Sequence, residues 1–343
     1  MRMLVAMRLS SFRDGPDKNT DRRSRVMWEE ASRRGIRIQE FRLFGIGRGI
    51  FLATYQGRHK AFLDLPRPGE VTSKGLLWMD DKEILRKKLR AAGVPTPRGG
   101  AATTIKEALA LFKRISPPVI TKPEIGSRSR HTRTHIHTTD ELVQGFKKAK
   151  VLSPWVIVEE EEVGFVYRGT VVGGKLVAVL RREPPMVIGD GVRTVAELVE
   201  NENKNPRRDG DIFHIIGIDD EAHVELGRQE LALESVPEKG RIVTFSQKAS
   251  RGIGGGTTDM TDSIHADNRV MLEAAAALVD DPLIGIDFII SDVATSWKVQ
   301  ERSGIIECNS MPFIDLHHYP LAGSPRNVAG ALWEIVFPTA PLT

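Results

Sequence analysis

The sequence predicts an α/β protein with two or three lobes, on the basis of three observations. At 343 residues the chain is long enough to bury more than one core. Its hydrophobic content of 41% and charged content of 27% are typical of a soluble globular protein. Short segments with strand-like alternation and longer segments of helical period follow one another along the chain.

Charge and cysteine content exclude several classes of protein. With 49 basic and 45 acidic residues the charges nearly balance, which argues against a dedicated nucleic-acid binder. The pI near 9.1 still permits anionic small-molecule substrates. Cys308 is the only cysteine, so no intrachain disulfide forms, as in a reducing compartment. Residues 1–9 are too short and too interrupted by Arg8 for a secretory signal. No run approaches the roughly 18 apolar residues of a membrane span. We therefore expect a cytoplasmic protein without a membrane partner.

Residues 1–65 are expected to form a small α/β unit. The expected elements are a strand at 3–9, a polar stretch at 10–19, a helix at 24–34, a strand at 36–44, a glycine-rich turn at 45–49 and a hairpin over 50–65. Gln56 and Gly57 place the turn of that hairpin. Residues 66–69 contain two prolines and a glycine and predict a linker.

Residues 78–338 are expected to form the main domain. A helix is expected at 82–92, where Asp80 or Asp81 can cap the first turn. Further helices are expected at 105–115, 139–149, 195–203, 223–233, 267–279 and 325–335. Strands are expected at 119–123, 133–138, 155–160 and 241–246, and a hairpin over 168–181 around Gly173-Gly174. Residues 207–220 are expected to be irregular and residues 252–258 to form a flexible loop.

Two apolar segments, 284–290 and 304–309, carry a candidate metal site. Each reads as a strand, so Glu307 and Asn309 point to one face and Cys308 to the other. If the strands pair, Asp287 can share that face, and three oxygen ligands of the kind that suits Mg²⁺ come together. The alternative is that the carboxylates lie at a solvated end of the sheet or pair with Arg or Lys.

Two lysines and a loop are candidates for binding phosphate groups. Lys122 lies within an apolar strand and Lys82 at the start of a helix, and phosphate oxygens are natural partners for a buried ammonium. Ser127, Arg128 and the backbone amides of the loop at 126–132 can close over a polyphosphate. The alternatives are lysine amines that reach water and a solvated basic loop.

Three further patterns are less specific. The four glutamates at 159–162 follow a strand, which usually marks a solvated end, but the segment can also form a hinge that holds a purine against backbone groups. Arg181 and Arg182 are adjacent in a strand, so only one of them can face a cleft. His135 and His137 share a strand face, without the Cys or carboxylate that would complete a zinc site.

The order of these features resembles the ATP-grasp superfamily, and more narrowly the ATP-grasp half of cyanophycin synthetases. The first feature is a lysine at the start of a helix, and this helix leads into Ala91-Ala-Gly-Val-Pro-Thr-Pro97. It is followed by a strand lysine, a loop, a strand ending in Glu, and an Asp ahead of Glu-x-Asn. The specific segments are Arg181-Arg-Glu-Pro-Pro-Met-Val-Ile-Gly-Asp-Gly-Val-Arg-Thr-Val-Ala-Glu-Leu-Val199, Gly254-Gly-Gly-Thr-Thr258 with Thr261-Asp-Ser-Ile-His265, Gly285-Ile-Asp-Phe288 and Ser324-Pro-Arg-Asn-Val-Ala329. The resemblance covers residues 78–338, with weaker likeness over 22–77.

The resemblance implies an ATP-grasp fold with an N-terminal α/β domain at 1–77, a small lid-bearing lobe at 118–165 and a lobe with the metal site at 166–338. It implies ATP and Mg²⁺ as cofactors, with two ions and with Mn²⁺ as an alternative. The implied reaction activates a carboxylate to an acyl phosphate, which an amine then attacks. Amino acids or peptides would be the substrates, and the protein would form a homo-oligomer.

The family's functional positions fall on residues of this sequence as follows. They are Lys82 and Lys122 for the phosphates, Ser127 and Arg128 in the lid, Glu159, Glu160, Glu161 and Glu162 at the adenine hinge, Asp287, Glu307 and Asn309 for Mg²⁺, and Arg181, Lys248 and Arg251 for the carboxylate or the transferred phosphoryl group.

The sequence departs from the family in three places. It ends before the Mur-ligase-like half of the synthetase, so the two-step building of cyanophycin is not expected from it alone. The lid has Ser129-Arg130-His131 where Gly-Arg-Gly is common. Val166 stands where an acidic residue usually holds the ribose hydroxyls, and valine cannot accept those hydrogen bonds, although Glu162 is a substitute.

Two hypotheses from other classes follow from these observations. The departures at the lid and at the ribose position suggest a catalytically weakened module that binds nucleotide for regulation or assembly. A nucleic-acid binder based on the basic region 122–150 is disfavoured, because no aromatic stacking platform accompanies the charge.

Overall fold

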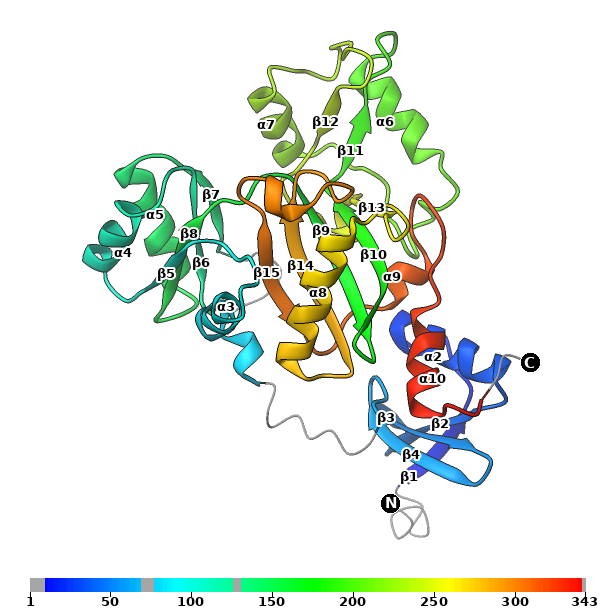
Figure 1. Ribbon diagram of the computed structural model, residues 1–343. Coiled ribbons are helices and arrows are strands. Elements are labelled where there is room, and N and C mark those ends of the chain that lie inside the picture. Colours follow the sequence, from blue (N-terminus) through cyan, green and yellow to red (C-terminus); the bar gives the residue numbers. More distant parts are fainter. Residues whose placement is uncertain (1–9, 69–76, 126–130, 341–343) are drawn as a thin grey trace.

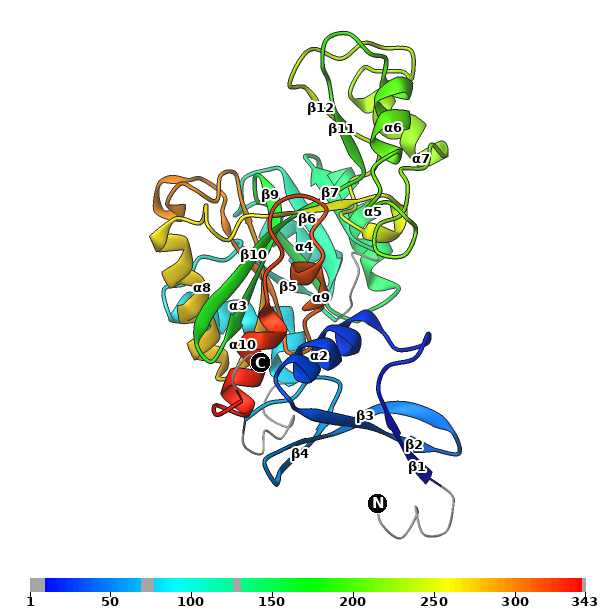
Figure 2. The same cartoon turned by 90° about the vertical axis from the view of Figure 1, so that its right-hand side faces the viewer.

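The computed structural model describes residues 10–68, 77–125 and 131–340, and the strands within these residues form four sheets. Figure 1 shows a small lobe, a central sheet, an N-terminal unit and an insert that projects beyond the central sheet. Figure 2 places the N-terminal unit and the insert at opposite ends of the molecule. The predicted α/β class is therefore confirmed.

The N-terminal unit is an antiparallel sheet packed against a helix. Its elements are β1 (Ser10–Asp14), α2 (Arg22–Arg33), β2 (Arg37–Leu43), β3 (Ile46–Tyr55) and β4 (Arg58–Leu63), and the sheet order is β1-β2-β3-β4. The hairpin at Gln56-Gly57 is confirmed: both residues have a positive φ, as this tight turn requires. The strand expected at 3–9 lies outside the described residues.

Strand β1 corrects the prediction of an irregular polar stretch at 10–19. Its polar side chains gave no strand signal, but they form ion pairs across the sheet, as Arg13 does with Glu40 at 2.9 Å. The backbone of β1 pairs with β2 from Ser10 to Asp14. Pairing with a neighbouring strand therefore outweighs the polar composition of an edge strand.

Helix α10 (Val328–Val336) joins the core of the N-terminal unit from the far end of the chain. Trp333 is fully buried and donates a hydrogen bond from Nε1 to the carbonyl of Met27 at 3.0 Å. The helix expected at 325–335 is thus present, and it packs against α2 (Figure 2). A domain boundary at residue 77 stays a prediction.

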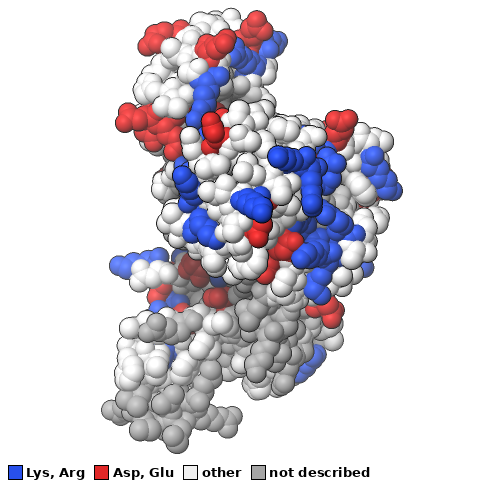
Figure 3. All heavy atoms as spheres, turned by 90° about the vertical axis from the view of Figure 1, so that its left-hand side faces the viewer, with Lys and Arg blue, Asp and Glu red and all other residues white. Residues whose placement is uncertain are grey.

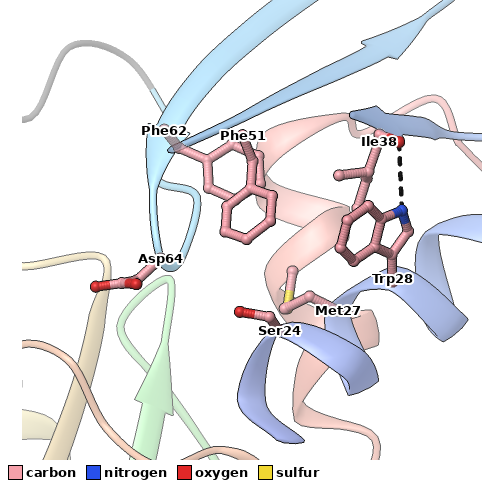
Figure 4. Close-up of a pocket in the computed structure, with 7 residues that line it drawn as sticks. All are labelled: Ser24, Met27, Trp28, Ile38, Phe51, Phe62 and Asp64. Carbon is pink, nitrogen blue, oxygen red and sulfur yellow. Dashed lines mark hydrogen bonds between the residues drawn. The ribbon is translucent and has the colours of Figure 1, made fainter. Parts of the chain in front are cut away.

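A hollow between α2 and the N-terminal sheet is apolar on most sides. Figure 4 shows Met27, Trp28, Phe51 and Phe62 around it, with Trp28 donating to the carbonyl of Ile38 at 3.3 Å. The hollow has no room for a water molecule. It is a packing gap of the core and not a ligand site.

The small lobe is a four-stranded sheet with two helices. Its strands, in spatial order, are β5 (Gly99–Ala102), β8 (Val156–Glu160), β6 (Val119–Pro123) and β7 (Arg133–Ile136), and its helices are α4 (Ile105–Phe112) and α5 (Thr139–Lys150). Both helices begin at a Thr-x-x-Glu capping box, at Thr104 and Thr138. Strand β5 was not predicted, because Gly-Gly-Ala-Ala lacks strand-forming side chains.

The central sheet is antiparallel, in the order β13-β10-β9-β14-β15. Its strands are β9 (Phe165–Val172), β10 (Lys175–Glu183), β13 (Gly256–Asp259), β14 (Leu283–Ile290) and β15 (Gly304–Asn309). Helix α8 (Ala266–Val279) crosses one face of the sheet (Figure 1). Helix α3 (Lys82–Ala91), capped by Asp81, and the short helix η2 (Leu77–Asp80) lie beside β15.

Two predictions for residues 166–338 were wrong in the extent of the predicted segment. Residues 252–258 were expected to be a flexible loop, but β13 pairs with β10 through Thr257 and Arg182. The helix expected at 223–233 is α7 (Asp220–Arg228), which begins earlier because Asp219 caps it. Short polar segments of this kind depend on neighbouring strands and caps that periodicity alone does not reveal.

The insert comprises residues 184–255 and has its own small core. Its elements are β11 (Met186–Ile188), α6 (Val195–Asn203), α7, β12 (Ile242–Thr244) and the short helix η3 (Arg251–Ile253). Within the described residues the other elements are η4 (Trp297–Val299) and α9 (Asp315–His318). In the described part of the chain no helix is long and apolar enough to cross a membrane.

Candidate active site

A row of polar side chains lies on one face of the central sheet, on β14 and β15. The predicted hairpin is confirmed: Asp287 pairs with Glu307, and Asn309 pairs with Gly285 two residues along. Partners in an antiparallel pair point to the same face, so the three side chains share it. Cys308 points the other way and is buried in the core. Alternation along two strands therefore assembles the predicted oxygen donors.

Two arginines from neighbouring strands face Asp287. Arg168 of β9 lies opposite Asp287 in the sheet and binds its carboxylate through Nε and through Nη2, the latter 2.8 Å from Oδ2. Arg182 of β10 adds a second cation, with Nη1 3.5 Å from Oδ2. Burial by itself would raise the pKa of Asp287, but the charge and hydrogen bonds of Arg168, together with Arg182, lower it below the usual value. Asp287 is therefore held ionised.

Glu307 has the opposite electrostatic environment. Burial and then the charge of Asp287 raise its pKa, and Lys82, Arg168 and Lys122 oppose that shift. Beside it, the side-chain amide nitrogen of Asn309 is buried without a hydrogen-bond partner among the described residues. A divalent cation at this row would remove the repulsion between the two carboxylates.

The row fits Mg²⁺ as one part of a coordination shell. No group of three or more His, Cys, Asp and Glu side chains within residues 10–68, 77–125 and 131–340 is placed to hold a metal ion. Asp287, Glu307 and the amide of Asn309 supply one or two carboxylates and a neutral oxygen. Mg²⁺ is commonly bound in this way, with substrate phosphates and water completing the shell.

The two predicted lysines approach this row from the small lobe and from α3. Lys122 of β6 is 2.5 Å from the carboxylate of Glu159, so its anionic partner in this structure is a protein carboxylate. Lys82 donates to the carbonyl of Glu124 at 3.2 Å. Both lysines act electrostatically on Glu307, which shows that the fold brings them to the same region. Ser127 and Arg128 lie outside the described residues.

The four glutamates at 159–162 end β8 and lead into the connection between the two sheets. Three of them have cationic or polar partners: Glu159 pairs with Lys122, Glu160 with Arg98 at 2.8 Å, and Glu161 accepts the backbone N–H of His135 at 2.7 Å. The segment is therefore not a solvated strand end. A role for it in holding adenine stays a prediction.

Glu162 lies in this connection and has an unusual pKa. Burial and then the charges of Glu160 and Glu159 raise that pKa to about 8, and Glu162 Oε2 has no hydrogen-bond partner among the described residues. Gly164 then turns the chain with φ +120, where a Cβ would lie 2.3 Å from the carbonyl oxygen of Ile290. The connection is thus closely packed against β14.

Two cavities meet beside Arg182. The first pocket, of about 600 Å³, is lined by Asp287 and Glu307 on one side and by α7 on the other. The second pocket, of about 450 Å³, is lined by Arg182, Lys248 and Arg251, and no carboxylate is among its lining residues as the structure describes them. Because both pockets include Arg182 and Lys248, we treat them as two ends of one cleft.

The surface around the first pocket is divided in charge. Figure 3 shows Lys and Arg gathered over the middle of the molecule and Asp and Glu frequent at the end formed by the insert. Lys148, in the basic last turn of α5, and Asp220 and Glu221, in the acidic first turn of α7, line the pocket from these two sides. Val166 lines it too, at the position where the resemblance expects a ribose-binding carboxylate.

Sequence reasoning named Arg181 where the structure favours Arg182. Arg181 bonds to Glu183 at 2.6 Å and lies over the ring of Phe165, on the sheet face opposite Asp287. Arg168 was missed altogether, although an arginine within an apolar strand was an available signal, as it was for Lys122. Its partner could be found only from the register of β9 with β14.

Comparisons with known proteins agree with this architecture. No family model matches the chain. Cyanophycin synthetase from Nostoc sp. is 35% identical over 263 residues, which cover 75% of this chain and 29% of that protein. The glutathione biosynthesis bifunctional protein of Mannheimia succiniciproducens is 30% identical over 270 residues, which cover 76% of this chain and 36% of that protein. The chain therefore spans only about a third of the length of these relatives.

A solved structure matches most of the fold. The bifunctional glutathione synthetase from Pasteurella multocida superposes with a TM-score of 0.71 at 24% identity, covering 93% of this chain and 44% of that one. At this identity the match establishes the fold alone. Together with the sequence matches over three quarters of the chain, it confirms the resemblance stated above. The chain has the ATP-grasp fold, and about three quarters of it is similar to one part of cyanophycin synthetase.

Proposed function

We propose that the protein is an ATP-dependent ligase that joins a carboxylate to an amine and releases ADP and phosphate. One observation carries the proposal: the row of Asp287 and Glu307 and the cation-lined second pocket meet at Arg182. Such a site can present a carboxylate substrate to the phosphate end of a nucleotide. Amino acids or peptides are the proposed substrates, since one group of relatives acts in glutathione biosynthesis.

In the first proposed step a carboxylate oxygen of the substrate attacks the terminal phosphorus of ATP. The bond from that phosphorus to the bridging oxygen breaks, ADP leaves with the electron pair, and an acyl phosphate forms. Arg182, Lys248 and Arg251 would hold the carboxylate and neutralise charge on the moving phosphoryl group. Lys82 and Lys122 would bind phosphate oxygens from the side of Glu307.

In the second step an amine nitrogen attacks the acyl carbon. The carbon–oxygen bond to phosphate breaks, phosphate leaves with the electron pair, and the nitrogen gives up a proton as the amide forms. Positioning the two reactants in one cleft accounts for much of such a rate enhancement. The acidic first turn of α7 is suited to hold a cationic amine before it reacts.

Asp287, Glu307 and Asn309 would hold Mg²⁺. When bound there, Mg²⁺ supplies positive charge to the phosphate oxygens during transfer. We propose two ions, with Mn²⁺ able to replace Mg²⁺. The raised pKa of Glu307, to which burial and the neighbouring charge of Asp287 contribute, supports a cation at this position.

The proposal is tested by measuring phosphate release from ATP and Mg²⁺ in the presence of pairs of amino acids and dipeptides. We expect release only when both a suitable carboxylate and a suitable amine are present, with an amide as the second product by mass spectrometry. Release without any acceptor would contradict a ligase, because it would identify an ATPase.

A second candidate is a nucleotide-binding module without turnover. Val166 in the first pocket and the ion pair that already engages Asp287 favour it. The distinguishing result is tight binding of ADP or ATP, measured by calorimetry, together with no phosphate release across the whole panel.

A further inference from the structure

Arg251 is held in the second pocket by a carboxylate that lies behind it. Its Nη2 donates to Oδ2 of Asp315 at 3.1 Å. Asp315 is 1% exposed and is not among the residues that line the pocket, whereas its neighbours Phe313 and Leu316 do line it. The segment that forms this wall therefore turns Asp315 away from the pocket and toward Arg251.

The contacts of Asp315 are few. In the part of the chain that the structure describes, Arg251 is its only side-chain ion-pair or hydrogen-bond partner, and Oδ1 is buried without one. A buried carboxylate with an unsatisfied oxygen destabilises the folded state. A stabilising effect on the fold therefore does not explain why an aspartate occupies position 315. Its contact with Arg251 offers an alternative explanation.

Contacts that do not involve Asp315 hold the backbone of the loop that carries Arg251. Arg208 is buried and donates to the carbonyls of Gly254 at 2.8 Å and His214 at 3.0 Å. Gly254 has φ +91, and a Cβ there would lie 2.7 Å from the Cα of Ile216. The loop is thus positioned without Asp315, so Asp315 acts on the side chain of Arg251 rather than on its backbone.

The guanidinium of Arg251 retains a donor. Because it is planar, a contact at Nη2 also restricts the direction of Nη1. In the described residues Nη1 has no hydrogen-bond partner. The other two cations of the pocket pair with carboxylates that line the first pocket, Lys248 with exposed Glu221 at 3.1 Å and Arg182 with Asp287 at 3.5 Å.

We propose that Asp315 is a positioning residue that orients Arg251 to bind the carboxylate substrate, or the phosphoryl group that it receives, in the second pocket. This inference rests on the proposed ligase function for its biological meaning. Its physical content is that the pocket binds an oxyanion and that Asp315 sets the strength of that binding through Arg251.

The first test uses inorganic phosphate as the probe, in the absence of ATP, with the full chain. Calorimetric titration of the wild type, of Asp315→Asn and of Asp281→Asn is compared. Asp281 is the matched control, since it is also buried and holds an arginine, Arg67, at 2.8 Å, but lines neither pocket. We expect Asp315→Asn to weaken phosphate binding roughly tenfold or more and Asp281→Asn to leave it unchanged.

Equal dissociation constants for the wild type and Asp315→Asn would overturn the proposal, as would the absence of phosphate binding in the wild type. If Asp315→Asn does not fold, Arg251→Lys replaces it, because lysine keeps the charge and loses the planar fork. The same weakening is expected from that variant. This measurement needs no turnover, so it can succeed or fail independently of the ligase proposal.

A second test separates positioning from a purely structural role. With a substrate pair that supports phosphate release, Asp315→Asn should raise the KM of the carboxylate substrate and leave the KM of ATP unchanged. A uniform loss of kcat with both KM values unchanged would identify a structural effect and contradict the proposal.

Discussion

Two acidic regions of the molecule, the polar row of Asp287, Glu307 and Asn309 on β14 and β15 and the glutamate run at 159–162, each combine paired carboxylates with one whose pKa is raised, which in the row is Glu307. In the row, Arg168 and Arg182 keep Asp287 ionised. In the run, three glutamates have partners, while Glu162 remains buried with a raised pKa of about 8. The comparison teaches that partners from other strands, and not the density of carboxylates along the sequence, decide which carboxylates stay charged.

The first prediction breaks the ion pair at the row. Replacing Arg168 with Met leaves Asp287 buried without its main cation, which should lower the free energy of unfolding by about 3–5 kcal/mol. Urea denaturation measures this loss. The control is Arg37→Met, which removes a solvent-exposed pair with Asp14 and should leave the free energy of unfolding nearly unchanged. Similar losses in both variants would contradict our assignment of Asp287 as an ionised, arginine-dependent group.

The second prediction concerns the other carboxylate of the row. Glu307→Gln removes a proposed Mg²⁺ ligand and should lower the rate of phosphate release roughly a hundredfold or more, because the charge on the phosphates loses a counterion. Exposed Glu301, which precedes the same strand, provides the control variant Glu301→Gln. Full activity in Glu307→Gln would remove the metal assignment.

The third prediction tests the unpaired carboxyl of the run. The folded-state pKa of Glu162, about 8, lies above its usual value of 4.5, so the folded state prefers the protonated form. Stability should therefore fall as the pH rises from about 4.5 to about 8 and then level off. Glu162→Gln removes this loss, so its free energy of unfolding should exceed that of the wild type by up to about 5 kcal/mol at pH 9 and should equal it at pH 4. Urea denaturation at both pH values measures the difference, and a gap that did not depend on pH would contradict the raised pKa.

The smallest expected effect separates the two adjacent arginines of β10. Arg182→Met should raise the KM of the carboxylate substrate roughly tenfold, because Arg182 lines both pockets. Arg181→Met is the matched control, since Arg181 lies on the other face and bonds to Glu183. Steady-state kinetics of phosphate release distinguishes them. A larger increase in KM for Arg181→Met than for Arg182→Met would instead support Arg181 as the substrate-binding residue.

Local signals predicted much of the fold. The Asp81 cap and the turns at Gln56-Gly57 and Gly173-Gly174 occur where expected, because each depends on residues only a few positions apart. Strands β1, β5 and β13 are among those that were missed. Their sequences are polar or glycine-rich, and they are strands because a neighbouring strand satisfies their backbone groups.

In the candidate site, too, local patterns were predicted correctly and contacts between distant residues were not. Alternation along a strand was enough to place Glu307 and Asn309 on one face, and Asp287 followed once the hairpin was assumed. Arg181 was chosen over Arg182 from the family resemblance, because alternation shows that the two differ in direction but not which of them faces the cleft. The partner of Asp315 could not be predicted either, since Arg251 is distant in sequence and arrives through the insert.

The sequence by itself determined the α/β class, the resemblance to ATP-grasp proteins and the shared face of the row, since these depend on periods of two residues, on caps and on recognisable segments. Tertiary structure alone decided which charges face one another. Arg168 meets Asp287 through the register of β9 with β14, and Arg251 meets Asp315 through the packing of the insert against α9. The physical reason is that burial and the charges of non-local neighbours set the pKa and the direction of a side chain.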